Sequence, residues 1–207
     1  MSDSALSRSR SRNSPNLNVS NMMFSRAGGS TAKRMLRDIE QLSQLNEIDP
    51  NSVLPPEEEC YVLAMWSSDS YYKTVLVGHG GIPAIVQVMR CFQSHQGIQE
   101  CCCIILGNLC SGGRATVLPV ECSRGVVAQI TMAMKIHSQS VAVQSAACEA
   151  LNNMSDLLLS HASNQMDDMV SNVIERLYYA KGMCLPPTHR QIAETILQTL
   201  TTTPYSP

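Results

Sequence analysis

The stretch that decides the fold covers residues 80–109 and reads GGIPAIVQVMRCFQSHQGIQECCCIILGNL. After the paired glycines, apolar side chains recur at helical spacing, at Ile82, Ile85, Val86, Met89 and Phe92. The second half of the stretch is apolar over most of a helical circumference, which is typical of a helix buried between other helices. No segment alternates between apolar and polar residues for long, so strands are not expected. The sequence therefore predicts an all-α fold.

Proline positions predict where the preceding helices begin and end. An apolar repeat that starts at Thr31 predicts a helix ending before Asp49-Pro50. The Pro55-Pro56 pair predicts the start of the next helix. Its first turn holds three acids, Glu57, Glu58 and Glu59. Proline and acidic residues both suit a helix start, because the first amides are unpaired and the helix dipole is positive there.

Length and composition narrow the class of protein. The chain has 207 residues, 44% of them hydrophobic, which suits one domain or a short repeat array. No uninterrupted apolar run approaches the roughly 20 residues of a membrane helix, and no early segment resembles a signal-peptide core. Nine cysteines without a secretion signal point to a reducing compartment. Aromatic residues make up 4%, too few for the stacking platforms of single-stranded nucleic-acid binders.

Charge divides the chain into a basic start and an acidic remainder. Residues 1–37 contain seven Lys and Arg against one Asp, whereas the remainder contains eight basic and sixteen acidic residues. Residues 1–30 are rich in Ser, Arg, Asn and Gly and lack apolar periodicity. Such a composition cannot bury enough surface to offset the entropy of ordering, so a disordered basic tail is expected there.

Three roles stay open for this tail. Ser14-Pro15 follows a Ser/Arg run and resembles a phosphorylation site, which would make the tail regulatory. The Arg- and Ser-rich, acid-poor composition also fits a mitochondrial presequence. The arginines are too few and too local for a nucleic-acid footprint, so a regulatory segment or an inert leader is favoured. We expect a cytoplasmic protein, with nuclear and mitochondrial locations as the alternatives.

The helical body repeats itself every 43 to 46 residues. At an offset of 45, identical residues coincide at four positions of the repeat: Gln99 with Gln144, Cys103 with Cys148, Leu106 with Leu151, and Asn108 with Asn153. Weaker matches extend the pattern to four units, at about 31–68, 69–111, 112–155 and 156–204. This period lies in the range of armadillo and HEAT repeats. The register predicts fully buried leucines at 106 and 151, helix breaks near Gly80-Gly81 and Arg124-Gly125, and long third helices over about 98–110 and 141–154.

Residues 80–109 resemble an armadillo repeat. The Gly80-Gly81-Ile82-Pro83 corner is similar to the bend between the first two helices of that repeat, and residues 106–109 are similar to the end of its third helix. Residues 125–154 match more loosely. The resemblance covers about 70–155, and 31–204 in outline. It is most like the divergent armadillo repeats of cytosolic scaffold proteins, including the armadillo region of leucine-rich-repeat kinases. It implies a right-handed α-solenoid of about three to four repeats, with polar end units as caps.

The resemblance also implies a binding surface. In armadillo proteins the third-helix asparagine often lines the concave groove, where its amide can pair with any peptide unit. That position is held here by Asn108 and Asn153, and satisfaction of both amides within the stack stays open as the alternative. Further third-helix positions on the same face are Glu57, Tyr61, Met65, Glu100, Ile104, Ser145, Glu149, Gln191, Thr195 and Thr199. This surface is mildly acidic with apolar patches, so the expected partner is a protein segment with basic and apolar residues.

One departure from the family narrows the expected partner. Nuclear-import adaptors of the armadillo family carry a Trp four residues before the asparagine, where this chain has Ile104 and Glu149. Recognition of nuclear-localisation signals by the same mode is therefore not expected.

Several Cys and His residues stand in patterns that could suggest catalysis or metal binding, but each pattern also has a structural explanation. Cys60, Cys103 and Cys148 recur at one repeat position, which indicates a packing role. Adjacent cysteines on a helix point about 100° apart, so the run at 101–103 is not expected to chelate one ion. His79-Gly80-Gly81 is similar to an esterase oxyanion loop, but the chain has no G-x-S-x-G nucleophile motif. The chain also lacks phosphate-loop and zinc-protease motifs.

The sequence therefore predicts a non-catalytic interaction protein without cofactor or metal. The expected function is binding of a partner segment along the concave face of a short armadillo-type solenoid. One alternative is an assembly or oligomerisation subunit that uses convex or end surfaces. The alternative from another class is a thiol- or metal-dependent protein built on the Cys and His residues.

Overall fold

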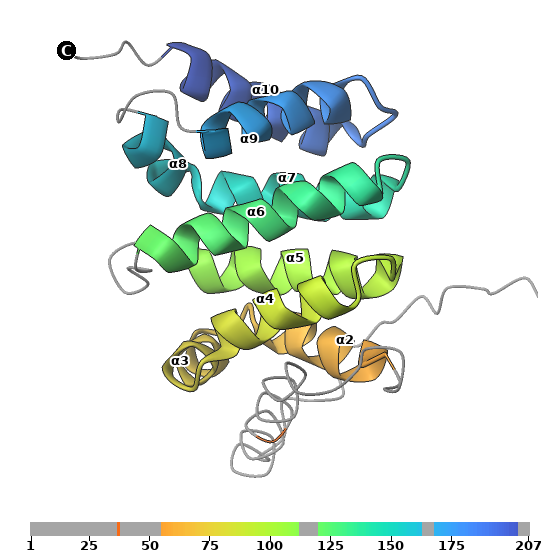
Figure 1. Ribbon diagram of the computed structural model, residues 1–207, viewed down its shortest axis with the longest axis vertical. Coiled ribbons are helices and arrows are strands. Elements are labelled where there is room, and N and C mark those ends of the chain that lie inside the picture. Colours follow the sequence, from red (N-terminus) through yellow and green to blue (C-terminus); the bar gives the residue numbers. More distant parts are fainter. Residues whose placement is uncertain (1–36, 38–54, 112–119, 163–167, 203–207) are drawn as a thin grey trace, which may run out of the picture.

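The computed structural model describes residues 37, 55–111, 120–162 and 168–202 (Figure 1). Within these ranges every regular element is a helix, so the predicted all-α class is confirmed there. The elements are α2 (Glu57–Trp66), α3 (Ser70–Gly78), α4 (Gly81–Cys91), α5 (Gln96–Cys110), α6 (Val120–Ile136), α7 (Val141–Asn153), α8 (Ser155–Ala162), α9 (Asp168–Lys181) and α10 (Pro187–Thr202). The predicted tail and, apart from Arg37, the predicted helix starting at Thr31 lie outside the described residues.

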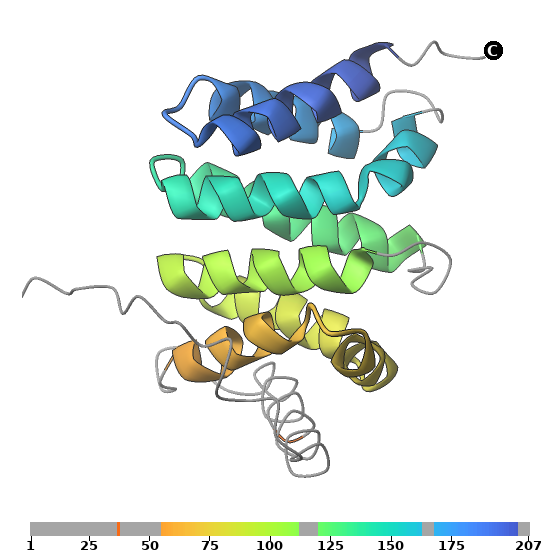
Figure 2. The same ribbon diagram turned by 180° about the vertical axis from the view of Figure 1, so that it is seen from behind.

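The larger helices form two layers. Layer A consists of α2, α5, α7 and α10, which follow one another in front in Figure 2 and contact their neighbours in that order. Layer B consists of α4, α6 and α9, which lie in front in Figure 1 and also contact one another in order. The pairs α4–α5, α6–α7 and α9–α10 join the two layers. In each of these three pairs, the first helix lies in layer B and the second lies in layer A.

One apolar core runs through both layers. It extends from Cys60 in α2 to Leu200 in α10 without a separate second cluster among the described residues. Leu106 and Leu151 are fully buried, as the 45-residue register predicts. A helix pair of this kind cannot bury its apolar face alone, and the neighbouring pair supplies the missing contact.

The two long third helices lie where the apolar pattern predicts them. α5 covers Gln96–Cys110 and α7 covers Val141–Asn153, within two residues of the expected ranges. Their packing is close at Gly107, where an added Cβ would lie 2.8 Å from the Ala150 Cα. Glycine is therefore required at this α5–α7 crossing.

The predicted break at the paired glycines is confirmed. Gly80 has a φ of 76°, in the left-handed region that glycine adopts without a Cβ penalty, and it lies directly before α4. Gly81 begins α4, and a Cβ there would lie 2.7 Å from the Leu76 carbonyl oxygen. The two glycines thus serve different needs, one conformational and one steric.

The predicted break near Arg124-Gly125 is wrong. α6 continues from Val120 to Ile136 without interruption. Gly125 has no positive φ, and no described atom lies within 4 Å of where its Cβ would be. A glycine inside a helix weakens the helix without ending it, and the apolar contacts of α6 outweigh that cost.

Two buried glutamines repeat the same hydrogen bonds. Gln99 donates from Nε2 to the carbonyl oxygens of Met89 (3.0 Å) and Phe92 (2.9 Å). One unit later, Gln144 donates to the carbonyl oxygens of Met134 (2.7 Å) and His137 (3.2 Å), so all acceptors are also shifted by 45 residues. Each amide satisfies the carbonyl end of the preceding layer-B helix, which has no partner inside its own helix. We call this arrangement the glutamine clamp.

Candidate partner-binding groove

The site begins with two helices that run side by side in the same direction, α2 and α5. At their starts, Glu57 Oε1 lies 3.6 Å from His95 Nε2. At their ends, Asn108 donates from Nδ2 to the Ser67 hydroxyl at 2.9 Å. Contacts at both ends fix the register of the two helices, so the residues that face each other across the gap are held in place.

An open groove of about 620 Å³ lies between α2 and α5. It is lined by Glu57, Glu58, Tyr61, Ala64 and Met65 from α2 and by Gly97, Glu100, Cys101 and Ile104 from α5. The lining includes five residues of the predicted face: Glu57, Tyr61, Met65, Glu100 and Ile104. We refer to this feature as the α2–α5 groove.

The groove has an acidic end and an apolar end. Its three carboxylates lie near the helix starts, at Glu57, Glu58 and Glu100. Met65 and Ile104 lie further along the same two helices. From Glu57 to Met65 the groove follows eight residue steps of α2, about 12 Å at 1.5 Å per residue.

The acidic end carries negative charge without a cation from its own lining. None of the described lining residues is a Lys or Arg. Glu100 is partly buried, and this burial raises the pKa of its carboxyl above the usual range. Two helix starts contribute only about half a positive charge each, which is less than three carboxylates contribute in the opposite sign. The groove therefore presents a negative site beside apolar surface.

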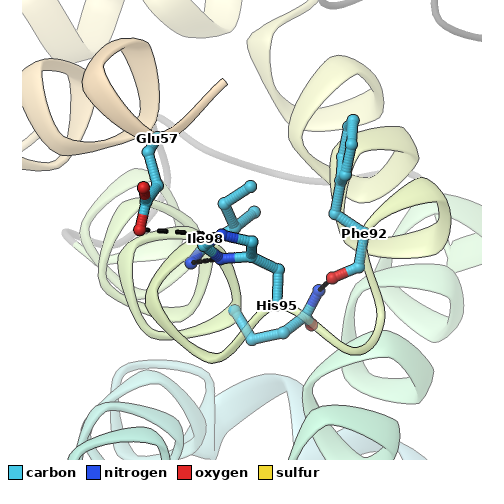
Figure 3. Close-up of polar contacts among 5 residues, drawn as sticks. Glu57, Phe92, His95 and Ile98 are labelled. Atoms are coloured by element: carbon cyan, nitrogen blue, oxygen red, sulfur yellow. Dashed lines mark hydrogen bonds and ion pairs between the residues drawn. The ribbon is translucent and has the colours of Figure 1, made fainter. Parts of the chain in front are cut away.

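His95 organises the acidic end, as Figure 3 shows. It is the N-cap of α5, and its Nδ1 accepts a hydrogen bond from the Ile98 amide at 3.4 Å. An accepting Nδ1 leaves Nε2 as the protonated ring nitrogen, and Nε2 faces Glu57. The backbone amide of His95 donates to the Phe92 carbonyl at 3.0 Å. One side chain thus caps α5 and orients the Glu57 carboxylate.

The structure gives the two predicted asparagines a role within the stack. Besides the bond from Asn108 to Ser67, Asn153 donates from Nδ2 to the Gly107 carbonyl at 3.2 Å. Each side chain therefore reaches the helix of the preceding unit. The side-chain Nδ2 of each asparagine already donates a hydrogen bond. A bound peptide would therefore have to displace that bond or pair with the side-chain amide oxygen.

The remaining predicted residues lie on α7 and α10 and outside the groove. Glu149 is bonded to His189, with Oε1 2.8 Å from Nε2. The Ser145 hydroxyl is enclosed and has no hydrogen-bond partner among the described residues. Thr195 and Thr199 donate to carbonyl oxygens one turn earlier in α10, and Gln191 is exposed. The structure thus brings together the α2 and α5 members of the predicted set, and the lining of their groove includes no α7 or α10 residue.

Four lining residues were missed by the sequence prediction. They are Glu58, Ala64, Gly97 and Cys101. Helical spacing could have found two of them, because Ala64 follows Tyr61 by three residues and Gly97 precedes Glu100 by three. Cys101 had been assigned to the structural cysteine run. Glu58 had been considered only as a helix-start acid.

Two other grooves differ in chemistry. One of about 530 Å³ lies between α6 and α9 and mixes both signs of charge, including Lys135, Asp168 and Glu175. The other, of about 560 Å³, lies beside the turns before α7 and α10 and includes Tyr178 and Tyr179. Neither groove combines an end that carries charge of a single sign with an apolar end. Both are therefore weaker candidates for binding a specific partner segment.

Four of the cysteines are core residues. Cys60, Cys102, Cys103 and Cys148 are buried and free. Burial raises the pKa of Cys103 and of Cys148 to about 12. A thiol held neutral is a poor nucleophile and a poor metal ligand. In the described part of the chain, no three His, Cys, Asp or Glu side chains are grouped to hold a metal ion.

Comparison with protein-family models, with curated proteins and with solved structures found no match. Among the described helices, none is both long and apolar enough to cross a membrane. The grounds for a function are therefore the residues and contacts of the groove.

Proposed function

We propose that this chain is a non-catalytic interaction protein that binds a segment of a partner protein in the α2–α5 groove. The observation that carries the proposal is the polarity of that groove. Three carboxylates stand at one end, and Met65 and Ile104 stand at the other. This arrangement suits a segment that places a basic side chain and an apolar side chain on the same side.

The dimensions of the groove favour an extended segment. An extended chain rises about 3.3 Å per residue, so a groove of about 12 Å takes some four residues. Alternate side chains of such a segment point the same way and lie about 7 Å apart. This spacing is close to the distance of about 6 Å between Glu100 and Ile104 along α5. A basic and an apolar residue two positions apart would therefore fit.

We further propose that the fold is a short armadillo-type solenoid. Three features support this: the two layers of alternating helices, the glycine corner at the start of α4, and the glutamine clamp repeated at 45 residues. The predicted four-unit division follows from the same proposal. Layer A then corresponds to the third helices, whose exposed face binds partners in armadillo proteins.

The alternative of assembly through end surfaces has one observation in its favour. Tyr71 is 59% exposed at the start of α3 and makes an edge contact with Tyr72, with ring centroids 5.3 Å apart. Tyr72 stacks in turn on Trp66. This aromatic cluster adds exposed apolar surface beside the Asp69 cap of α3. The thiol- or metal-dependent alternative is not proposed, because the pKa values of the buried Cys102, Cys103 and Cys148 are raised and no three metal ligands are grouped among the described residues.

The nine cysteines favour a reducing compartment such as the cytoplasm as the place where the protein acts. The eight cysteines whose side chains the structure describes are free, and four of them lie in the core. An oxidising compartment would expose such thiols to pairing with one another during folding.

The proposal is tested by selecting ligands from a random displayed peptide library on the full chain. We expect the enriched peptides to share a basic and an apolar residue two positions apart, and Glu100→Lys to abolish their capture. Glu175→Lys is the matched control, because Glu175 is exposed on α9 in layer B. Capture that survives Glu100→Lys, or enrichment of peptides without a basic residue, would contradict the proposal.

A further inference from the structure

We propose that the α2–α5 groove is occupied in cis by residues 22–26 of this chain, Met22-Met23-Phe24-Ser25-Arg26, which compete with the partner segment. The inference rests on the proposed function, because it assigns an intramolecular regulator to the same groove. Four steps support it: the charge of the segment, the spacing of its side chains, its direction, and the length of chain that tethers it.

The first step is charge complementarity. The groove carries three carboxylates and no Lys or Arg among its described lining residues. The first 37 residues of the chain carry seven basic residues against one acid. Opposite charges on one chain meet at a high effective concentration, so even a weak contact is populated in cis.

The second step is the spacing of side chains. In an extended segment, Met22, Phe24 and Arg26 point to the same side and span about 13 Å. The groove spans about 12 Å from Glu57 to Met65. Arg26 at the acidic end would place Phe24 about 7 Å away, beside Ile104. Phe24 is one of only two phenylalanines in the chain, and the other, Phe92, is buried in the core.

The third step is direction. The described body begins at Pro55, two residues before Glu57, so the chain enters the body at the acidic end of the groove. With Arg26 at that same end, the segment runs from the apolar end to the acidic end and leaves toward Pro55. The connection therefore does not have to cross the groove.

The fourth step is the length of the tether. Residues 26 and 55 are separated by 29 residue steps. Even at the helical rise of 1.5 Å per residue, these would cover about 44 Å, more than the length of the groove. The chain between residues 26 and 55 is therefore long enough for residues 22–26 to reach the groove.

Other basic parts of the first 37 residues fit less well. Arg8, Arg10 and Arg12 alternate with serine, so an extended segment there presents charge without an apolar neighbour on the same side. These arginines can add a general electrostatic attraction to the acidic groove, which salt screens, but they offer no side chain for the apolar end of the groove. This difference supplies an internal control.

The experiment uses the full chain in three forms: wild type, Phe24→Ser/Arg26→Ser, and Arg8→Ser/Arg10→Ser/Arg12→Ser. Methyl NMR signals of Met65 and Ile104 report occupancy of the groove. We expect the Phe24/Arg26 variant to shift both signals relative to wild type. The triple-arginine variant, although it removes more charge, should leave them near their wild-type positions.

A second readout is the affinity of a labelled synthetic peptide of residues 20–28 added in trans. At low ionic strength it should bind the Phe24/Arg26 variant at least about threefold more tightly than wild type, because the cis competitor is gone. Equal affinities, unmoved methyl signals, or equal effects of the two variants would overturn the inference.

The same experiment separates this inference from the proposed function. If the peptide of residues 20–28 fails to bind the Phe24/Arg26 variant while library-selected peptides bind it, the cis occupant is wrong and the groove function stands. If neither kind of peptide binds, both proposals fail.

Discussion

Gln99 and Gln144 each use one amide group to satisfy two carbonyl oxygens at the end of the preceding layer-B helix. Both side chains are almost fully buried, so water cannot replace the bonds. A buried carbonyl without a partner costs more than the net contribution of the hydrogen bond itself, because its desolvation is then uncompensated. Gln99 and Gln144 therefore each hold the end of a layer-B helix against a layer-A helix.

The glutamine clamp can be tested by Gln99→Leu. The change keeps a side chain of similar size but removes the Gln99 donor from both carbonyls, and Phe92 O keeps only the bond from the His95 amide. We expect a loss of about 1–3 kcal/mol in the free energy of unfolding, measured by urea denaturation. Gln198→Leu, at an exposed position of α10, should change stability by less than about 0.5 kcal/mol. Equal effects of the two changes would show that the clamp contributes nothing.

The buried thiols predict a loss of stability at alkaline pH. Burial raises the pKa of Cys103 and of Cys148 to about 12, whereas thiols of the unfolded chain ionise near pH 9. Between these values the unfolded state loses protons that the folded state keeps, so the free energy of unfolding falls as pH rises. Each thiol contributes a slope of at most about 1.4 kcal/mol per pH unit, and its full stabilising effect is present below pH 9.

This pH dependence is measured by urea denaturation under reducing conditions at several pH values above neutrality. Cys148→Ala is the control, since it removes one titrating group with a small change of volume. Its slope above pH 9 should be shallower than that of the wild type. Parallel curves for the two proteins would contradict a neutral buried thiol at Cys148.

At the scale of helices, two glycines show why the same residue type lies at a corner between helices in one place and inside a helix in another. Gly81 lies at a corner where a Cβ would come within 2.7 Å of a backbone oxygen. Gly125 lies inside α6 with no described atom within 4 Å of its Cβ position. The difference comes from tertiary contacts and from the φ of the residue before Gly81, neither of which is visible in a local sequence window.

The two glycines predict opposite effects of alanine. Gly81→Ala should destabilise by about 1–3 kcal/mol, because the new methyl group meets backbone that cannot move aside. Gly125→Ala should stabilise by about 0.5–1 kcal/mol, because alanine favours the helix and fills open space. Thermal and urea denaturation of the full chain measure both. If both variants change the free energy of unfolding in the same direction, the proposed difference between the Gly81 corner and the interior of α6 is wrong.

Much of the helical pattern could be predicted from sequence, because burial dictates apolar spacing. α5 and α7 were predicted closely since their apolar residues continue around the helix. Of the site, the 43-residue offset between the first two units placed Glu100 and Ile104 on one face with Tyr61 and Met65. The partners of Glu57 and Asn108 could not be predicted, since they depend on the distance between α2 and α5 at each end. The polarity of the groove arises from that same register.

At the scale of the whole molecule, the α2–α5 groove is a chemically specific feature of layer A. The α2–α5 groove is acidic at the end where the chain enters the body, and apolar further along. In the neighbouring units, Glu149 is bonded to His189 and the threonines of α10 are bonded to backbone, so less binding capacity remains there. Binding is therefore expected to centre on the first described unit rather than to extend along the entire layer.

The central claim is tested most directly by the affinity of the full chain for a library-selected peptide, measured by calorimetry on two isoleucine variants. Ile104→Glu places a charge at the apolar end of the α2–α5 groove, and Ile136→Glu places the same charge on the exposed end of α6. We predict that Ile104→Glu weakens binding by at least about tenfold, or 1.4 kcal/mol. Ile136→Glu should leave the affinity at its wild-type value. If the two variants bind the peptide equally well, the α2–α5 groove is not the binding site.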